Sequence, residues 1–283
     1  MAPEWRSVLR TLLVLAASLT CLGRGKAEEN PTGKAAEPLD ASVAKCENSI
    51  EPEALKEALR PVCVRTRAAD GRGAARSATR SAILVGFVGG FARHDDLKHP
   101  EVNFAALFRG SYPSVHADVF ANHEGKKALR RVLQLVDSDS DGVLTASEKE
   151  RANVIIYGHS WGGSQTVALA RALGRYGIPV LLTIQMDSVQ KPGQEDATIP
   201  ANVKNAINFY QTKGLIHGRS TIRAADPEKT NVLGNVEMTY RDRQINCANY
   251  PWFPRHFNKP HHEIENDPQV WDRVALLVGA EIW

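Results

Sequence analysis

The sequence lacks a strong excess of either charge, and it lacks an apolar run long enough to cross a membrane. Its 35 lysines and arginines nearly balance 32 aspartates and glutamates, which gives a formal net charge of +3 and a pI of about 8.6. This basic excess is too small to indicate binding to nucleic acid or to an anionic membrane surface. The apolar segment at residues 11–23 is shorter than a bilayer requires, so no stable membrane span is expected.

Residues 1–27 have the pattern of a signal peptide. Arg6 and Arg10 precede the apolar segment TLLVLAASLTCLG, whose length suits a signal-peptide core. Small residues at Gly25 and Ala27 favour cleavage after Ala27, although the lysine between them leaves the site open by several residues. We therefore expect a secreted or periplasmic protein, with an uncleaved anchor as the alternative.

Cysteine is scarce, with four residues in a chain of 283. Cys21 would leave with the signal peptide, and the residues before it lack the small side chain expected before a lipoprotein cysteine. Cys46, Cys63 and Cys247 would remain in an oxidising compartment. The simplest pairing joins Cys46 to Cys63 across a short helical stretch and makes Cys247 the odd residue. Alternatively, all three are buried as small hydrophobic side chains.

The chain divides into an N-terminal extension and one main domain, and it contains no internal repeat of useful length. Residues 28–80 are predicted to form a disordered leader and a short helical extension that ends in an Arg-rich linker. Residues 81–283 form the main domain, in which apolar runs alternate with helical stretches. The predicted strands are residues 82–88, 115–120, 153–158, 178–186 and 205–210, and the predicted helices are 125–136, 164–177 and 268–280. This order predicts an α/β fold with a mostly parallel sheet covered by helices on both faces.

One of these strands ends in an unusual run of glycines around a serine, IIYGHSWGG at residues 155–163. Gly158 and Gly162 stand two residues either side of Ser160, and Gly163 follows. A very tight turn from strand into helix explains this spacing, because strained angles at the serine leave no room for side chains two residues away. Such a turn holds the hydroxyl above the edge of the sheet, where the start of the next helix offers N–H groups to an oxyanion.

With this motif, the sequence resembles the α/β-hydrolase superfamily, in particular its lipase, esterase and thioesterase members. The resemblance extends from about residue 81 to the C-terminus in the order of elements, and residue by residue only around Ser160. It implies a nucleophilic serine, an acid and a histidine base, in that order along the chain. A turn serine without chemistry is the alternative.

The acid favoured by position is Asp187, at the C-terminal end of the predicted strand 178–186. Most of the superfamily carries its acid one strand later, but there the chain has Gln211 and Thr212, which cannot serve. Some lipase-like members place the acid where Asp187 stands. An exposed loop aspartate is the alternative.

The base is predicted to be His261, in a loop before the terminal helix, with His262 as its competitor. His217 and His256 are expected to be surface or pocket-lining residues. His159, beside the nucleophile, is expected to shape the cleft without transferring protons.

The resemblance also implies an oxyanion hole made of two backbone N–H groups. One is that of Trp161, directly after the serine, and the other comes from the loop after an earlier strand. Gly89 and Gly90 permit a close turn there, and Phe91 stands where similar lipases have their second donor. An ordinary turn at Gly89–Gly90 is the alternative.

A second motif, DSDSDGVLTASE at residues 137–148, matches the EF-hand calcium-loop template D-x-D-x-D-G-x5-E. The predicted calcium ligands are Asp137, Asp139, Asp141, the carbonyl of Val143, Thr145 directly or through water, and bidentate Glu148. The helix after this loop is short, and no second loop of the kind is present. Because the loop precedes the strand that ends at Ser160, the ion is expected about 20–25 Å from the serine, at the opposite edge of the sheet. A structural role for calcium follows, with a solvated acidic turn as the alternative.

Together these features predict a secreted serine hydrolase that cleaves carboxylic esters or thioesters of a small molecule or lipid and binds structural calcium. A peptidase or amidase would use the same three residues, and a calcium-binding interaction protein on a silent hydrolase fold is a further alternative. Aromatic residues between about 215 and 257 are suited either to an acyl pocket or lid, or to the core. The sequence leaves the acyl-chain length and the oligomeric state open.

Overall fold

The computed structural model describes residues 81–252 and 257–282. The predictions for the signal peptide, the leader and extension up to residue 80, Cys46, Cys63 and His256 lie outside these residues. Cys247 lies within them and is buried, with 4% of its surface exposed.

Six parallel strands form the central sheet, in the order β2-β1-β3-β4-β6-β8. They are β1 (Ala82–Val88), β2 (Val115–Ala121), β3 (Val154–His159), β4 (Val180–Met186), β6 (Val203–Tyr210) and β8 (Asn231–Glu237). A separate pair, β5 (Thr198–Ile199) and β7 (Arg223–Ala224), is also parallel. The helices are α3 (Pro100–Ser111), α4 (Gly125–Val136), α5 (Ala146–Arg151), α6 (Trp161–Arg175), α8 (Lys259–Asn266) and α9 (Pro268–Ile282).

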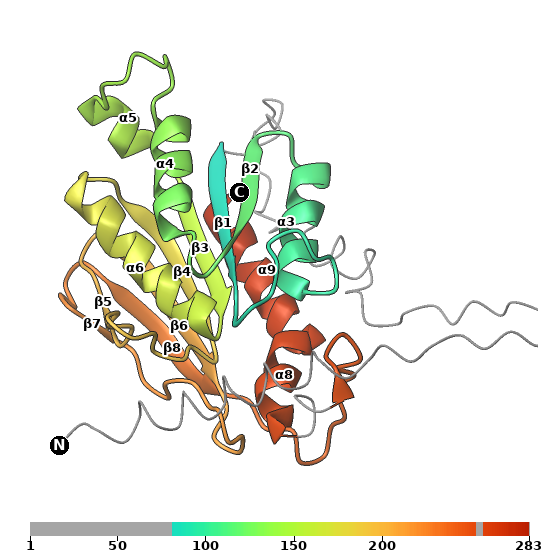
Figure 1. Cartoon of the computed structure of the whole chain (residues 1–283). Coiled ribbons are helices and arrows are strands. Elements are labelled where there is room, and N and C mark those ends of the chain that lie inside the picture. Colours follow the sequence, from blue (N-terminus) through green and yellow to red (C-terminus); the bar gives the residue numbers. More distant parts are fainter. Residues whose placement is uncertain (1–80, 253–256, 283) are drawn as a thin grey trace, which may run out of the picture. The chain divides into compact units, whose positions relative to one another are not determined.

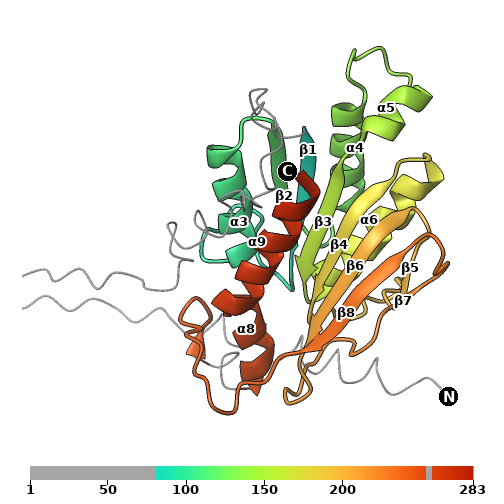
Figure 2. The same cartoon turned by 180° about the vertical axis from the view of Figure 1, so that it is seen from behind.

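Helices cover both faces of the sheet (Figures 1 and 2). On one face, Phe104 of α3 and Trp271 of α9 pack with Tyr157 of β3 in one hydrophobic cluster. On the other face, α4 and α6 pack against a second cluster that includes Ile156 of the same strand. β3 is therefore buried on both sides, which explains why its sequence is a continuous apolar run rather than an alternating one.

The predicted α/β class, with a mostly parallel sheet covered on both faces, is confirmed. Several elements were not predicted, and two of them flank or cover the sheet. The first is α3, which begins at a proline that suits the first turn of a helix. The second is β8, whose residues alternate between exposed and half-buried because it forms an edge of the sheet, so it carries no buried apolar run.

The register of the strands brings their C-terminal ends to one edge. His159 of β3 pairs with Met186 of β4, which in turn pairs with Phe209 of β6. Ser160 and Asp187, the next residues on the first two of these strands, therefore lie at the same level on neighbouring strands. No helix within the described residues has the length and apolar character needed to cross a membrane.

Candidate active site

Ser160 sits in a strained turn between β3 and α6. Its φ of 56° and ψ of −124° are unusual for a residue with a side chain, and such strain is typical of functional positions. A Cβ at Gly158 would lie 2.5 Å from the carbonyl carbon of Gly162, and one at Gly162 would lie 2.2 Å from the carbonyl oxygen of Phe87. The spacing of glycines around Ser160 thus reflects close backbone approaches on both sides of the turn.

Asp187 follows β4 in a similarly constrained position, with a φ of 43°. The backbone links the two turns directly, because Ser160 N donates to the carbonyl of Met186 at 3.0 Å. Val189 N donates back to the carbonyl of Ser160 at 3.1 Å. These bonds fix the serine against the start of the loop that carries the aspartate.

His261 contacts the carboxylate of Asp187. Its Nδ1 lies 2.6 Å from Asp187 Oδ2, and both side chains are buried. Burial raises the pKa of Asp187, but the hydrogen bond from His261, together with bonds from Gln211 and the N–H of Gly218, outweighs it, so the pKa is below its usual range. The carboxylate is thus held ionised, as a group that orients and stabilises a protonated imidazole must be.

Gln211 and Gly218 support this carboxylate, and the sequence analysis missed both roles. Gln211 Nε2 donates to Asp187 Oδ2 at 2.8 Å, and Gly218 N donates to Asp187 Oδ1 at 2.8 Å. A Cβ at Gly218 would lie 2.2 Å from the carbonyl carbon of Asp187, so only glycine fits there. From the sequence, Gln211 is only a residue that cannot serve as the catalytic acid. Its position at the end of the neighbouring strand is the sequence feature that indicates a supporting role.

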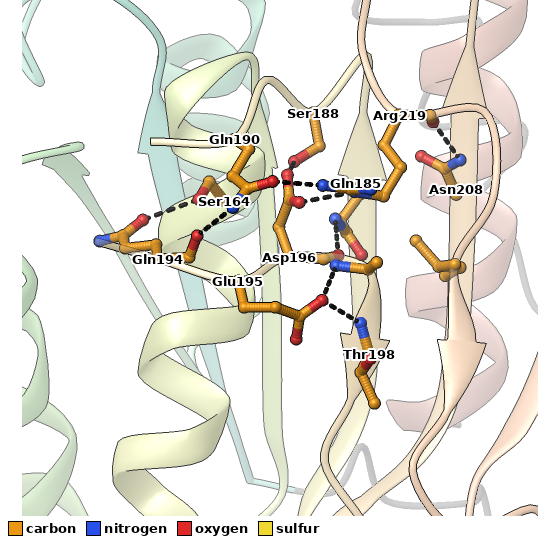
Figure 3. A network of polar contacts seen from close by, with 12 residues as sticks. Ser164, Gln185, Ser188, Gln190, Gln194, Glu195, Asp196, Thr198, Asn208 and Arg219 are labelled. Atoms are coloured by element: carbon orange, nitrogen blue, oxygen red, sulfur yellow. Dashed lines mark hydrogen bonds and ion pairs between the residues drawn. The ribbon is translucent and has the colours of Figure 1, made fainter. Parts of the chain in front are cut away.

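A polar network anchors the loop that follows Asp187 (Figure 3). Buried Asp196 accepts from Ser188 Oγ at 2.7 Å and from Arg219 Nε at 2.7 Å. Arg219 N also donates to the carbonyl of Ser188 at 2.8 Å. Ser188 follows Asp187, and Arg219 follows Gly218, which donates to the Asp187 carboxylate. The network therefore fixes both Asp187 and its hydrogen-bond donor Gly218.

The predicted loop location of His261 is wrong, since this residue lies in the first turns of α8. Pro260 occupies the start of this helix, where a proline is tolerated, so the sequence pattern resembled a loop. The competitor His262 is also buried, and its ring stacks on Tyr250 with centroids 3.7 Å apart. His217 is exposed, as expected for a surface histidine.

His159 has a different position from the one expected. It is 2% exposed, its ring lies 4.5 Å from that of His261, and its Nε2 is 3.0 Å from the carbonyl oxygen of His261. Burial lowers the pKa of His159 to about 3, which keeps the ring neutral. His159 therefore supports the start of α8 from the interior rather than forming part of an open cleft.

The residues predicted for an oxyanion hole lie around Ser160. Trp161 is the first residue of α6, so the helix itself does not engage its N–H. A Cβ at Gly89 would lie 2.9 Å from the Cβ of Ser160, which places the loop after β1 against the serine. Asn122 Nδ2 donates to the carbonyl of Gly90 at 2.6 Å and steadies this loop. Phe91 follows with its side chain 89% exposed, and its ring lies 6.0 Å from that of Trp161.

In the segment predicted to line a pocket or form a lid, the exposed large apolar side chains include Leu215, Trp252 and Phe257. Two surface hollows, of about 680 and 380 Å³, lie elsewhere. The larger is lined by Arg171, Arg175 and Arg223 among others, near the C-terminal end of α6, and Ser160 is at the opposite end of that helix.

The acidic loop between α4 and α5 has features suited to calcium. Asp137, Asp139 and Asp141 each offer one oxygen, and these oxygens lie within 4.8 Å of one another. Gly142 has a φ of 82°, which permits the sharp turn. The loop and α5 lie at the end of β3 opposite to the turn into α6 (Figure 1).

Glu148 faces this loop from α5. One of its oxygens accepts from Ser138 N at 2.7 Å, and the other accepts from Thr145 N at 3.0 Å. Hydrogen bonds from Thr145 and Ser138 lower the pKa of Glu148 to about 2, so the carboxylate is ionised. The three aspartates form a cluster of hard oxygen donors, the ligand type that Ca²⁺ prefers, and Glu148 lies beside it with both oxygens hydrogen-bonded to the loop.

Comparisons with known proteins are limited to structures of low similarity. No protein-family model and no curated protein matches the sequence. An arylesterase aligns over 72% of this chain and 78% of its own, at 6% identity and a TM-score of 0.38. A dienelactone hydrolase-like promiscuous phosphotriesterase from metagenomic libraries aligns over 72% of this chain and 87% of its own, at 15% identity and a TM-score of 0.35. A cutinase-like protein from Cryptococcus sp. aligns over 73% of this chain and 97% of its own, at 10% identity and a TM-score of 0.36. The assignment of function therefore rests on the site itself.

Proposed function

We propose that this chain is a secreted serine hydrolase that cleaves carboxylic esters or thioesters through an acyl-enzyme. The observation that carries the proposal is the strained turn at Ser160, beside a buried pair in which His261 Nδ1 lies 2.6 Å from Asp187 Oδ2. A serine, a histidine and an ionised aspartate in this arrangement are the parts that nucleophilic acyl transfer requires.

In this reaction His261 is the general base. Its Nδ1–H donates to Asp187, which leaves Nε2 to take the proton of the Ser160 hydroxyl as Oγ attacks the carbonyl carbon. Within the described residues no hydrogen bond joins Ser160 to His261, and such contacts in free enzymes often close only when substrate binds. His261 then returns the proton to the departing alkoxide or thiolate, and water attacks the acyl-enzyme by the same steps.

The oxyanion that forms on the carbonyl oxygen needs donors that are already in place. The backbone N–H groups of Trp161 and Phe91 fill this role, with the loop of Gly89 and Gly90 held against the serine. Loss of one such donor typically costs about 10²–10³ in kcat.

Calcium in the loop at residues 137–148 has a structural role in this proposal. Asp137, Asp139, Asp141, the carbonyl of Val143, Thr145 and Glu148 would hold the ion, which neutralises the clustered carboxylates. The loop lies at the other end of β3 from Ser160, so its residues take no part in the acyl transfer.

The test is turnover by the purified chain of three substrate sets with a common acyl group: 4-nitrophenyl esters, thioesters and anilides. We expect hydrolysis of esters or thioesters that Ser160→Ala abolishes. Hydrolysis of anilides at a comparable kcat/KM would instead identify an amidase or peptidase. Absence of turnover by a folded wild-type protein on all three sets would contradict the proposal.

A further inference from the structure

Four ionisable side chains are buried together directly behind the turn at Ser160. His99 directly precedes α3, Glu101 lies in the first turn of that helix, His159 ends β3 and Glu265 lies in α8. Their exposed fractions are 8%, 0%, 2% and 1%, respectively. Buried charges in proteins are paired or coordinate metals, so such a cluster requires an explanation.

Three of the four side chains, His99, Glu101 and Glu265, meet at one point, and His159 faces the two carboxylates from β3. His99 Nδ1 lies 2.8 Å from Glu265 Oε1, and His159 Nδ1 lies 3.7 Å from Glu265 Oε2 and 3.9 Å from Glu101 Oε1. One ligand atom from each of His99, Glu101 and Glu265 falls within 4.8 Å of the other two. Tetrahedral ligands at zinc-like bond lengths of about 2.1 Å are about 3.4 Å apart, so small side-chain shifts would suffice.

Part of the cluster has no hydrogen-bond partner. Within the described residues no donor reaches the two carboxylate oxygens of an ionised Glu101, and the Nδ1 of His159 has no hydrogen-bond partner. A protonated Glu101 would instead share its proton with Glu265. Glu265, by contrast, is hydrogen-bonded: Tyr250 OH donates to its carboxylate, and Trp271 Nε1 donates to its backbone carbonyl at 2.6 Å. Leaving polar atoms without partners at this depth is costly, and His159 Nδ1 lies 3.9 Å from Oε1 of Glu101.

We propose that His99, Glu101, His159 and Glu265 bind one divalent transition-metal ion, with Zn²⁺ as the favoured metal. Two carboxylates and two neutral imidazoles around a divalent cation carry no net charge, which is the least costly combination to bury. Imidazole and carboxylate ligands suit zinc, whereas Ca²⁺ and Mg²⁺ prefer oxygen ligands alone. The site is distinct from the acidic loop at residues 137–148.

The hydrogen bond of His159 is arranged as in a metal ligand. A carbonyl oxygen only accepts, so the nitrogen 3.0 Å from His261 O carries the hydrogen and the other nitrogen of the neutral ring presents its lone pair to the cluster. Metal-bound histidines usually donate their second N–H to a carbonyl or carboxylate in this way. With four protein ligands the site is closed, as structural zinc sites are.

Such an ion would connect three segments that meet behind Ser160. It would join the start of α3, the last residue of β3 and α8, which also carries His261. His159 and Glu265 would act on His261 as positioning residues. The binding of the ion does not depend on the proposed hydrolase activity and is testable without a substrate.

The test is metal content and cobalt binding of the full chain. We expect about one equivalent of zinc to remain after dialysis against metal-free buffer, and Co²⁺ added to stripped protein to give the visible absorption bands of tetrahedral coordination. Glu101→Gln, which keeps the shape and removes a charged ligand, should weaken binding at least 10-fold.

Two matched variants separate this site from others. Glu263→Gln alters another buried glutamate of α8 that pairs with Lys259, and Asp139→Asn alters the acidic loop; both should keep the zinc. Wild-type protein that holds no zinc and gives no tetrahedral cobalt spectrum would overturn the proposal, in favour of a proton shared between Glu101 and Glu265. Equal zinc binding by wild type and Glu101→Gln would also overturn it.

Discussion

Asp187 Oδ2 lies 2.6 Å from His261 Nδ1, although the two residues are 74 positions apart in the chain. The contact places a histidine next to the strained turn of Ser160, because Asp187 stands level with the serine on the neighbouring strand. The proposed reaction depends on this pair, and the following predictions test it and the surrounding structure.

Replacement of the two adjacent histidines should have unequal effects. His261→Ala removes the base and should lower kcat by about 10⁴-fold or more. His262→Ala removes a ring that stacks on Tyr250, so we expect a loss of stability and less than about a 10-fold change in kcat of the folded fraction. Steady-state kinetics on one ester, with the folded fraction measured by circular dichroism, compares the two. A larger loss of kcat in His262→Ala would reassign the base.

Asp187→Asn should lower kcat by about 10³–10⁴-fold, because the histidine would lose the partner that fixes its tautomer. A matched variant is Asp196→Asn, which disturbs the loop anchored by Arg219 without touching His261. That variant should affect stability more than kcat. Equal kcat losses in the two variants would point to loop disorder rather than to a role of the carboxylate.

The same aspartate should contribute to stability in a pH-dependent way. Its pKa is lower in the folded protein than in the unfolded chain, where aspartate titrates near pH 3.9. Its contribution is therefore present above about pH 4 and is lost as the pH falls through the folded-state pKa. Urea unfolding of wild type and Asp187→Asn between pH 7 and pH 3 should show a difference in unfolding free energy that shrinks only below about pH 4. A difference that grows on acidification would contradict this sign.

The glycines around Ser160 should be intolerant of alanine for steric reasons. Gly158→Ala and Gly162→Ala would place a Cβ within 2.5 and 2.2 Å of backbone atoms, and we expect a loss of about 1–3 kcal/mol or more in unfolding free energy. Gly110→Ala in α3 is the control, since nothing lies within 4 Å of its added Cβ. Helix propensity predicts a gain there of about 0.5–1 kcal/mol. Similar effects at all three positions, measured by chemical unfolding, would refute the steric account.

Removal of calcium should destabilise the protein without stopping turnover. Adding Ca²⁺ to metal-stripped wild type should raise the melting temperature, whereas Asp139→Asn should respond little. Glu101→Gln should retain the calcium response, because Glu101 lies outside the loop. If Ca²⁺ changed kcat of the folded fraction rather than its melting temperature, the structural role would be wrong.

Part of this organisation is predictable from sequence. The fold class follows from buried strands that are continuous apolar runs, and Ser160 and Asp187 were identified because each follows such a run. The helix carrying His261 was mistaken for a loop, since Lys259–Asn266 contains a proline, two histidines and two glutamates and only one aliphatic residue. Edge strand β8 was missed because one of its faces is exposed and the other is only half-buried.

The residues that support Asp187, and the buried cluster behind Ser160, could be identified only from the structure. Gln211 and Gly218 contact Asp187 only because β6 and the following loop return to the same edge of the sheet. The cluster of His99, Glu101, His159 and Glu265 draws on three elements, and its sequence gives no spacing motif. Contacts of this kind arise from tertiary packing, on which local periodicity carries no information.

The most direct test of the central claim is labelling of the intact chain by a fluorophosphonate probe, followed by peptide mapping of the modified residue. The account predicts covalent modification at Ser160 in the wild type, none in Ser160→Ala, and much slower modification in His261→Ala. A folded wild-type protein that stays unlabelled, or a label on another residue, would contradict the assignment of Ser160 as an activated nucleophile.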